Sequence, residues 1–155
     1  MEKIVYNLSR REAGRFNGEF DHTNAVWISI GEPTDEFVHT KNEHLDKLPN
    51  LKMCFWDITR ARNYTNFITG EEEQADPPKV DQAMQIVDFL LKHSDKDVIV
   101  NCAMGISRSG AIAQFCQDFL FHQWPKRFQD RACPNTLLYN MMRDYYKGEN
   151  LIKYV

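Results

Sequence analysis

Short runs of apolar residues alternate along the chain with longer stretches in which apolar residues recur every three or four positions. The short runs are too brief for most helices and are bounded by polar residues, a pattern typical of buried strands. Strands are therefore predicted at residues 3–6, 25–30, 51–56 and 98–101.

Three longer stretches show the period of an amphipathic helix, with the apolar residues gathered on one face. They predict helices at residues 80–91, 112–120 and 134–147. The second pattern ends at Trp124-Pro125, because the residue before a proline disfavours helical geometry. Pro134 suits the first turn of the third helix, and Gly148 suits its end.

Alternating strands and helices indicate an α/β fold, in which a central, mainly parallel sheet is flanked by helices. A length of 155 residues suits one compact domain, so residues 1–155 are expected to form a single domain. The least regular stretch is 59–78, which contains three consecutive glutamates and two consecutive prolines. About 20 residues without a clear pattern indicate either a functional loop or a solvated surface excursion.

Amino-acid composition and net charge argue against several classes of protein and partner. The chain has 43% hydrophobic and 26% charged residues, a balance that argues against a largely disordered protein. Its net charge of -3 provides no basic field for nucleic acid or for an anionic membrane. The sequence shows no signal-peptide pattern and no apolar stretch of about 18 residues. We therefore expect a cytoplasmic protein without a nucleic-acid or membrane partner.

The four cysteines are Cys54, Cys102, Cys116 and Cys133. They form no Cys-x-x-Cys pair and have no histidines at matching spacing, which argues against a zinc site. We therefore expect no metal and no cofactor. In a reducing compartment their thiols are expected to stay reduced.

The segment with the clearest chemistry joins the predicted strand at 98–101 to the predicted helix at 112–120. A strand–loop–helix junction of this kind directs several backbone N–H groups and the positive end of a helix dipole at one point, where an anion can bind. Gly105 permits the tight backbone path that turns these amides inward.

Two side chains complete this predicted anion site. Arg108 offers a planar set of donors that suits two phosphoryl oxygens at once. Cys102 lies at the end of the strand in the same positive field, which favours the thiolate and lowers the pKa of the thiol. A thiolate beside a bound phosphate is a nucleophile placed for attack on phosphorus. Ser109 is positioned to donate a hydrogen bond to the sulfur and to assist its release.

The segment Cys-x5-Arg-Ser after a hydrophobic strand resembles the signature of the protein tyrosine phosphatase superfamily. The dual-specificity branch is most similar, because Gly105, Ser107, Arg108 and Ser109 match its pattern Cys-x-x-Gly-x-Ser-Arg-Ser. The resemblance covers residues 51–120. It implies hydrolysis of phosphotyrosine, and of phosphoserine or phosphothreonine, through a phosphocysteine intermediate on Cys102.

The same resemblance implies that the loop between Cys102 and the helix binds the substrate. The residues concerned are Ala103, Met104, Gly105, Ile106, Ser107 and Arg108. One position departs from the family pattern, since Asn101 stands where the family has a histidine that orients the loop and tunes the thiolate. An asparagine donates hydrogen bonds but carries no charge, so Cys102 is expected to be a weaker acid than in the family.

Hydrolysis of a phosphomonoester also needs a proton for the leaving oxygen. In the family an aspartate upstream of the cysteine supplies it, and Asp57, directly after the predicted strand at 51–56, resembles that acid. Asp57 lies 45 residues before Cys102, a longer separation than is usual in the family. Asp76 is the rival candidate, and two further alternatives stay open, namely Asp81 and the absence of a general acid.

The uncharged loop residues Ala103, Met104 and Ile106 favour a phosphorylated protein or a small phosphomonoester over a phosphoinositide. Two other function classes remain open. One is a catalytically weak or inactive phospho-binding module, and the other is a thiolate enzyme such as an arsenate reductase or a sulfurtransferase. Cys54 lies three residues before Asp57, which suggests a protective disulfide with Cys102. The oligomeric state is not predicted.

Overall fold

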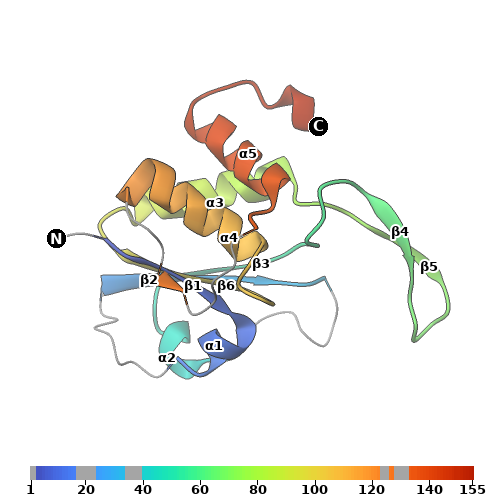
Figure 1. Cartoon of the computed structure of the whole chain (residues 1–155), viewed down its shortest axis with the longest axis horizontal. Helices are drawn as coiled ribbons and strands as arrows, with labels where there is room; N and C mark the ends of the chain where they lie inside the picture. Colours follow the sequence, from blue (N-terminus) through green and yellow to red (C-terminus); the bar gives the residue numbers. More distant parts are fainter. Residues whose placement is uncertain (1–2, 17–23, 34–39, 123–125, 128–132) are drawn as a thin grey trace.

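The computed structural model describes residues 3–16, 24–33, 40–122, 126–127 and 133–155. In these residues a five-stranded sheet has the strand order β3-β2-β6-β1-β7, and every neighbouring pair is parallel (Figure 1). The strands are β1 (Val5–Ser9), β2 (Ala25–Gly31), β3 (Asn50–Cys54), β6 (Asp97–Cys102) and β7 (Lys126–Arg127). The predicted α/β fold with a mainly parallel central sheet is therefore confirmed.

Helices cover both faces of this sheet (Figure 1). The helices α3 (Val80–Lys92), α4 (Arg108–Phe115) and α5 (Thr136–Tyr146) lie on one face, where α5 packs against α3 and α4. The shorter helices α1 (Arg10–Gly14) and α2 (Glu43–Asp46) lie on the other face. A sheet covered in this way needs strands that are apolar on both sides, and all seven residues of β2 are buried.

Side chains of β6 alternate between the two faces. Val98, Val100 and Cys102 belong to the hydrophobic cluster shared with α3, α4 and α5, whereas Ile99 belongs to the cluster on the α1 side. Successive residues of a strand point to opposite faces, so Asn101 faces α1 and α2 while Cys102 faces α4. In the sheet register Ser9 of β1 pairs with Cys102, which brings the end of β1 beside the predicted nucleophile.

The three predicted helices are present, with shifted ends. α4 begins at Arg108, four residues before the predicted start, because its first turn is built of loop residues without apolar periodicity. It continues as a π-helix at Cys116–Phe121 and ends at His122, whose φ is 54°. The predicted stop at Trp124-Pro125 lies outside the described residues. α5 begins at Thr136, because the side chain of Asn135 caps it by accepting a hydrogen bond from the Leu138 amide.

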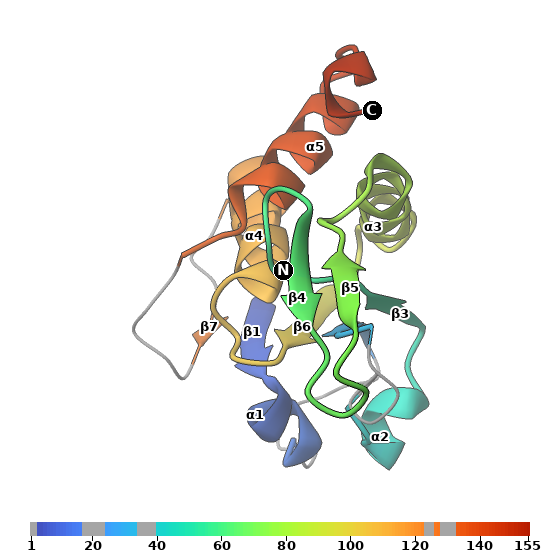
Figure 2. The same cartoon turned by 90° about the vertical axis from the view of Figure 1, so that its right-hand side faces the viewer.

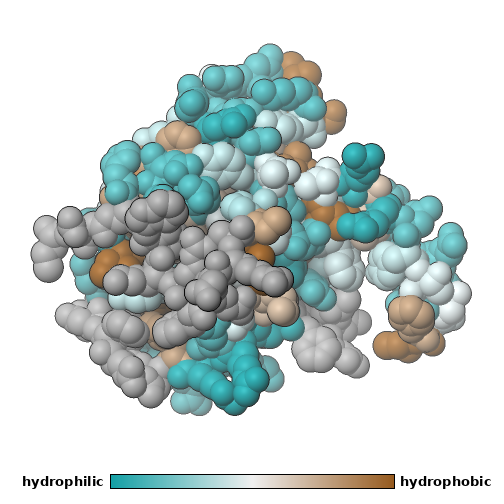
Figure 3. Space-filling model, in the orientation of Figure 1, coloured by the Kyte–Doolittle hydropathy of each residue, from teal (hydrophilic) through white to brown (hydrophobic). Residues whose placement is uncertain are grey.

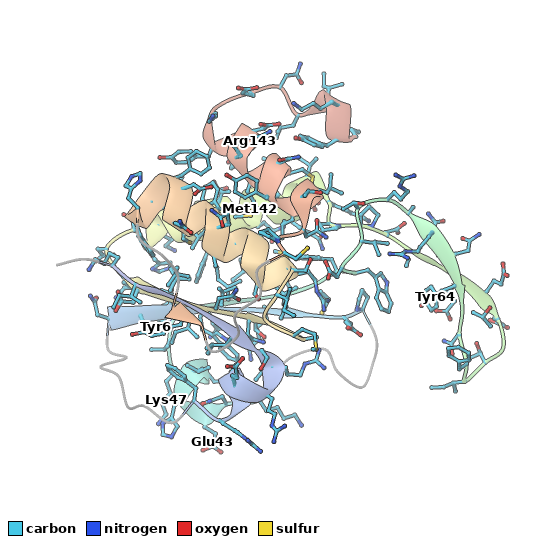
Figure 4. All side chains as sticks on the ribbon, viewed as in Figure 1. Tyr6, Glu43, Lys47, Tyr64, Met142 and Arg143 are labelled. Carbon is cyan, nitrogen blue, oxygen red and sulfur yellow. The ribbon has the colours of Figure 1, made fainter. Side chains whose placement is uncertain are left out.

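The irregular stretch at 59–78 is an arm with its own structure. The strands β4 (Arg62–Thr65) and β5 (Glu72–Ala75) pair antiparallel and project from the body (Figures 1 and 2). Tyr64 lies on this arm, away from the main sheet, and its hydroxyl donates to Glu73 Oε2 over 2.6 Å (Figure 4). The strands escaped prediction because their residues are mostly polar and form no apolar run.

The tip of the arm is hydrophobic and exposed. Phe67 and Ile68 are 99% and 87% exposed, and hydrophobic atoms gather at the tip in Figure 3. The turn is held by Asn66, whose side-chain oxygen accepts hydrogen bonds from the amides of Ile68 and Thr69.

None of the described helices is long and apolar enough to cross a membrane.

Candidate active site

The loop that follows β6 lies against the end of β1. Gly105 adopts a φ of 71°, and a Cβ atom added there would lie 2.6 Å from both the carbonyl carbon of Leu8 and the amide nitrogen of Ser9. The amide of Arg10 donates to the carbonyl of Ala103 over 3.1 Å. Glycine is thus required at position 105 both for its backbone conformation and for the close approach of two chain segments.

Cys102 is 2% exposed, and polar groups lie around its sulfur. Ser109 Oγ lies 3.1 Å from the sulfur, and the backbone N–H groups of Ser109 and Gly105 also favour the thiolate. Burial acts to raise the pKa of Cys102, but these donors and the positive charge of Arg108 outweigh it, so the pKa lies below that of an ordinary thiol. This direction agrees with the expected thiolate.

Cys116, on the same helical segment as Ser109, provides a contrast. It is also fully buried, but burial is the dominant influence there and raises the pKa of its thiol. Two buried cysteines in one chain therefore differ in their acidity because only Cys102 has a shell of donors. This environment is typical of a structural cysteine that packs in the core.

Arg108 is 4% exposed, and its guanidinium group is partly paired with protein atoms. Nη1 donates to the carbonyl oxygen of Phe55 over 3.0 Å, and Nη2 lies 3.5 Å from Glu32 Oε1. Nε is buried and has no hydrogen-bond partner among the described residues. A buried N–H without an acceptor costs about 1–3 kcal/mol, so an anion that accepts from Nε would stabilise this site.

Asp57 lies beside the loop. Its Oδ1 accepts hydrogen bonds from Ser107 Oγ over 2.6 Å and from Asn135 Nδ2 over 3.0 Å. Its Oδ2 has no hydrogen bond to any residue that the structure describes. A proton on this carboxyl group is therefore best carried on Oδ2, which leaves Oδ1 free to accept both hydrogen bonds.

The two rival aspartates have different surroundings. Asp76 is exposed and accepts a hydrogen bond from Gln74 at the end of β5, and Asp81 is exposed in the first turn of α3. No hydrogen bond in the described part of the chain joins either of them to the loop after β6. Among the three candidates, hydrogen bonding connects only Asp57 to that loop.

Three residues at this site were missed in the sequence. Asn135 donates to Asp57, and its backbone N–H donates to the carbonyl of Ser107 over 3.0 Å. Asn7 of β1 accepts a 2.6 Å hydrogen bond from Ser109, and Glu32 pairs with Arg108. A Pro-Asn pair before a helix indicates a cap, but its contact with a loop 28 positions earlier depends on tertiary structure.

Asn101 does not contact the loop through its side chain. Its Oδ1 accepts from Trp27 Nε1 and its Nδ2 donates to Thr40 Oγ1, both over 2.9 Å. Trp27 and Thr40 are buried, and the side chain of Asn101 faces away from the sulfur of Cys102. The side chain of Asn101 therefore stabilises the opposite face of the sheet, and the expected weaker acidity of Cys102 relative to the family stays a prediction.

A pocket of about 230 Å³ lies between the end of β3 and the base of the arm, and its lining includes neither Cys102 nor Arg108. It is lined by Pro33, Cys54, Phe55, Trp56, Gln74, Asp76, Pro77, Lys79 and Gln82. Phe55 links it to the site, since its carbonyl accepts a hydrogen bond from Arg108.

Cys54 and Cys102 are both thiols in this structure. Burial raises the pKa of Cys54 while the charge of Arg108 opposes the rise, and a disulfide between Cys54 and Cys102 stays a prediction.

The residues expected to bind substrate line the loop with different exposure. Met104 is 62% exposed, Ala103 and Ile106 are half-buried, and Gly105 is buried. Within the described residues no group of three or more His, Cys, Asp or Glu side chains is suited to a metal ion.

Comparisons with known proteins give a likeness to solved structures but no match in sequence. No protein-family model matches the sequence, and no curated protein matches it. A solved structure titled "Crystal structure of Tk-PTP in the active form" aligns with 15% sequence identity and a TM-score of 0.46. The alignment covers 99% of this chain and 86% of that chain.

Proposed function

We propose that this chain is a cysteine-dependent phosphatase that hydrolyses phosphomonoesters through a phosphocysteine intermediate on Cys102. The observation that carries the proposal is the surroundings of one buried sulfur, where the Ser109 hydroxyl lies at 3.1 Å and where the positive charge of Arg108 and the backbone of Gly105 favour the thiolate. Such surroundings stabilise a thiolate, and the same donors stabilise the negative charge of a phosphoryl group in the transition state.

In the first step the Cys102 thiolate attacks phosphorus and displaces the leaving oxygen. Arg108 and the amides of the loop bind the non-bridging oxygens, and Arg108 Nε is a buried donor available for this contact. Asp57 transfers the proton on Oδ2 to the leaving oxygen, so the products are a neutral alcohol and phosphocysteine.

In the second step water attacks the phosphocysteine, and the Asp57 carboxylate accepts its proton. The bond between sulfur and phosphorus breaks, inorganic phosphate leaves, and the thiolate returns. Ser109 assists by donating a hydrogen bond to the departing sulfur. Neither step requires a metal ion or a cofactor.

For the substrate we propose a phosphorylated protein or a small phosphomonoester, with phosphotyrosine as the first choice and phosphoserine or phosphothreonine as the second. Cys102 is buried whereas Met104 of the same loop is exposed, so the phosphoryl group must reach inward to the sulfur. The uncharged loop side chains offer no additional cation for a polyphosphorylated headgroup. We also propose that residues 1–155 act as one catalytic domain, because the groups at the site come from segments spread between Asn7 and Asn135.

The decisive experiment is hydrolysis of p-nitrophenyl phosphate in EDTA and reductant, comparing the wild type with Cys102→Ser and Asp57→Asn. We expect no turnover by Cys102→Ser and a strong loss in Asp57→Asn. Arg108→Ala should lose about 100-fold or more in rate, as is common for the loss of a transition-state contact. Full activity of Asp57→Asn would indicate that Asp76, and not Asp57, is the general acid. An inactive wild type that still binds vanadate would make the chain a phospho-binding module.

The choice between phosphotyrosine and phosphoserine follows from a second assay. Peptides of one sequence that carry either residue are compared by phosphate release, with Cys102→Ser as the background control. A kcat/KM that is higher for the phosphotyrosine peptide supports the first choice. Equal values support a dual-specificity enzyme.

A further inference from the structure

A chain of hydrogen bonds runs from β1 through α4 to the nucleophile. Ser109 Oγ lies 2.6 Å from Asn7 Oδ1 and 3.1 Å from Cys102 Sγ. All three side chains are buried. Asn7 therefore lies next to the hydroxyl that stabilises the thiolate, although it is far from Cys102 in the sequence.

The serine hydroxyl has one hydrogen, and this limits what the chain of hydrogen bonds can do. When Ser109 donates to Asn7 Oδ1, it has no hydrogen left for the sulfur, and the thiol S–H must donate to Ser109 Oγ instead. That arrangement describes protonated Cys102. A thiolate only accepts, so it needs the Ser109 hydrogen for itself.

With the thiolate present, the hydroxyl oxygen of Ser109 can accept a hydrogen bond from Asn7. This requires the Asn7 amide to turn by about 180°, so that Nδ2 replaces Oδ1 beside the hydroxyl. The oxygen and nitrogen of a side-chain amide have nearly the same shape, so the turn needs no additional volume.

We propose that Asn7 is a positioning residue whose side-chain amide sets the direction of the Ser109 hydroxyl and turns over when Cys102 loses its proton to solvent. The link to catalysis rests on the proposed phosphatase function. In the second chemical step the sulfur again becomes a thiolate, and the Ser109 hydrogen must point toward it. Asn7 acts through Ser109 and does not contact the substrate.

Other charged groups also surround this chain of hydrogen bonds. Arg108 follows the loop, Glu32 pairs with Arg108, and Asp57 is held on the loop by Ser107. Substitution at Asn7 leaves these groups in the chain, so their effect on Cys102 is common to all the variants below.

The first test follows the amide directly in the wild-type protein. The side-chain ¹⁵NH₂ signals of Asn7 are recorded by NMR as a function of pH, with assignment from Asn7→Ser. The pKa of Cys102 is measured separately from the pH dependence of iodoacetamide alkylation, resolved by peptide mass. We expect the Asn7 signals to titrate with the same midpoint as Cys102 and to stay unchanged in Cys102→Ser and in Ser109→Ala. Signals that do not move while Cys102 titrates would overturn the proposal, and so would a titration that survives in Ser109→Ala.

The second test uses Asn7→Asp, which keeps the shape but offers only acceptors to Ser109. The Ser109 hydroxyl then keeps its hydrogen bond to the new carboxylate and has no hydrogen for the sulfur. We therefore expect about tenfold less Cys102 thiolate at a given pH, which is a rise of ~1 unit in the pKa of Cys102. Part of this effect comes directly from the new charge. The same substitution in a Ser109→Ala background isolates that part, so the shift should be clearly smaller there. Equal shifts in both backgrounds would contradict a role through Ser109.

A buried asparagine elsewhere serves as the matched control. Asn42 caps α2, and its Nδ2 donates to the carbonyls of Ala13 and Phe16. Asn42→Asp should lower stability without changing the alkylation profile of Cys102. If Asn7→Asp fails to fold, the NMR test on the wild type still decides the proposal. Neither the NMR titration nor the alkylation profile needs turnover. An inactive wild type would therefore count against the proposed function, and these two measurements would still decide the positioning role of Asn7.

Discussion

The side-chain amide of Asn135 donates a 3.0 Å hydrogen bond to Oδ1 of Asp57, although the two residues are 78 positions apart. The same side chain caps α5, since its Oδ1 accepts from the Leu138 amide over 3.0 Å. Asn135 therefore connects the start of a core helix to the proposed general acid. A substitution there should affect both stability and chemistry, and the two effects can be separated.

Asn135→Asp should retain the cap of α5, because aspartate is as good a cap as asparagine. It removes the amide donor and places a second carboxylate beside Asp57, so we expect kcat on p-nitrophenyl phosphate to fall while Tm changes little. Asn135→Ala should also lose the cap, at a cost of about 1 kcal/mol in the free energy of unfolding. Steady-state kinetics and thermal unfolding measure the two effects. A kcat equal to that of the wild type in Asn135→Asp would show that the hydrogen bond does not position Asp57.

Gly105→Ala should displace the loop. Its new Cβ would meet backbone atoms of Leu8 and Ser9 at 2.6 Å, and neither can move as a flexible side chain would. We expect a loss of about 100-fold or more in kcat/KM, as misplacement of a site by about 1 Å commonly causes. Gly148→Ala is the control, since Gly148 has a φ of 73° and no atom within 4 Å of an added Cβ. It should carry only the backbone strain of about 1–2 kcal/mol and leave turnover intact.

Asn101→Ala should reduce stability more than it changes the nucleophile. It leaves the Trp27 indole N–H without its acceptor and removes the donor to Thr40, in a region that is fully buried. We expect a loss of about 2–4 kcal/mol in the free energy of unfolding, measured by urea denaturation. The pH profile of Cys102 alkylation should stay within about half a unit of the wild type. A larger shift of this pH profile would show that Asn101 tunes the Cys102 thiolate, as the histidine does in the family.

The C-terminal segment is attached through Asp144. This buried carboxylate accepts hydrogen bonds from Tyr154, Arg143 and Lys153, and these contacts lower the pKa of Asp144 to about 2. Because the folded pKa lies below the ordinary value of 3.8, the stabilisation is complete above about pH 5 and is lost as the pH falls through 2. Asp144→Asn should cost roughly 1–2 kcal/mol at pH 7, and the difference from the wild type should shrink toward pH 2. Urea unfolding at several pH values measures it, and a difference that does not change with pH would contradict the assignment.

The tip of the arm should not be needed for the hydrolysis of small substrates. Phe67→Ser and Ile68→Ser alter exposed side chains at the end of the β4–β5 hairpin, where neither is packed against the core. We expect each to change the free energy of unfolding by no more than about 0.5 kcal/mol and to leave turnover of p-nitrophenyl phosphate unchanged. A loss of turnover in either variant would show that the tip contributes to the site.

Much of the architecture was predictable from local patterns. The strands β2 and β6 and the helix α3 were recognised from apolar runs and from apolar residues at intervals of three and four. Only the first two residues of β1 were predicted, because the buried polar residues Asn7 and Ser9 interrupt its apolar run. The strand–loop–helix segment around Cys102, Gly105 and Arg108 was equally visible, because its parts are contiguous in the chain. Their mutual geometry is a local property of the backbone.

The remaining features depend on contacts between distant segments. The polar strands of the arm have no apolar face to reveal them, and the short helices α1 and α2 depend on capping by Ser9 and Asn42. Asn7, Glu32 and Asn135 are ordinary polar residues in the sequence. They reach Ser109, Arg108 and Asp57 only because β1 and β2 lie on either side of β6 and because the start of α5 packs against the loop. Local propensity carries no information about such pairs, since each side chain finds its partner only after the elements have packed.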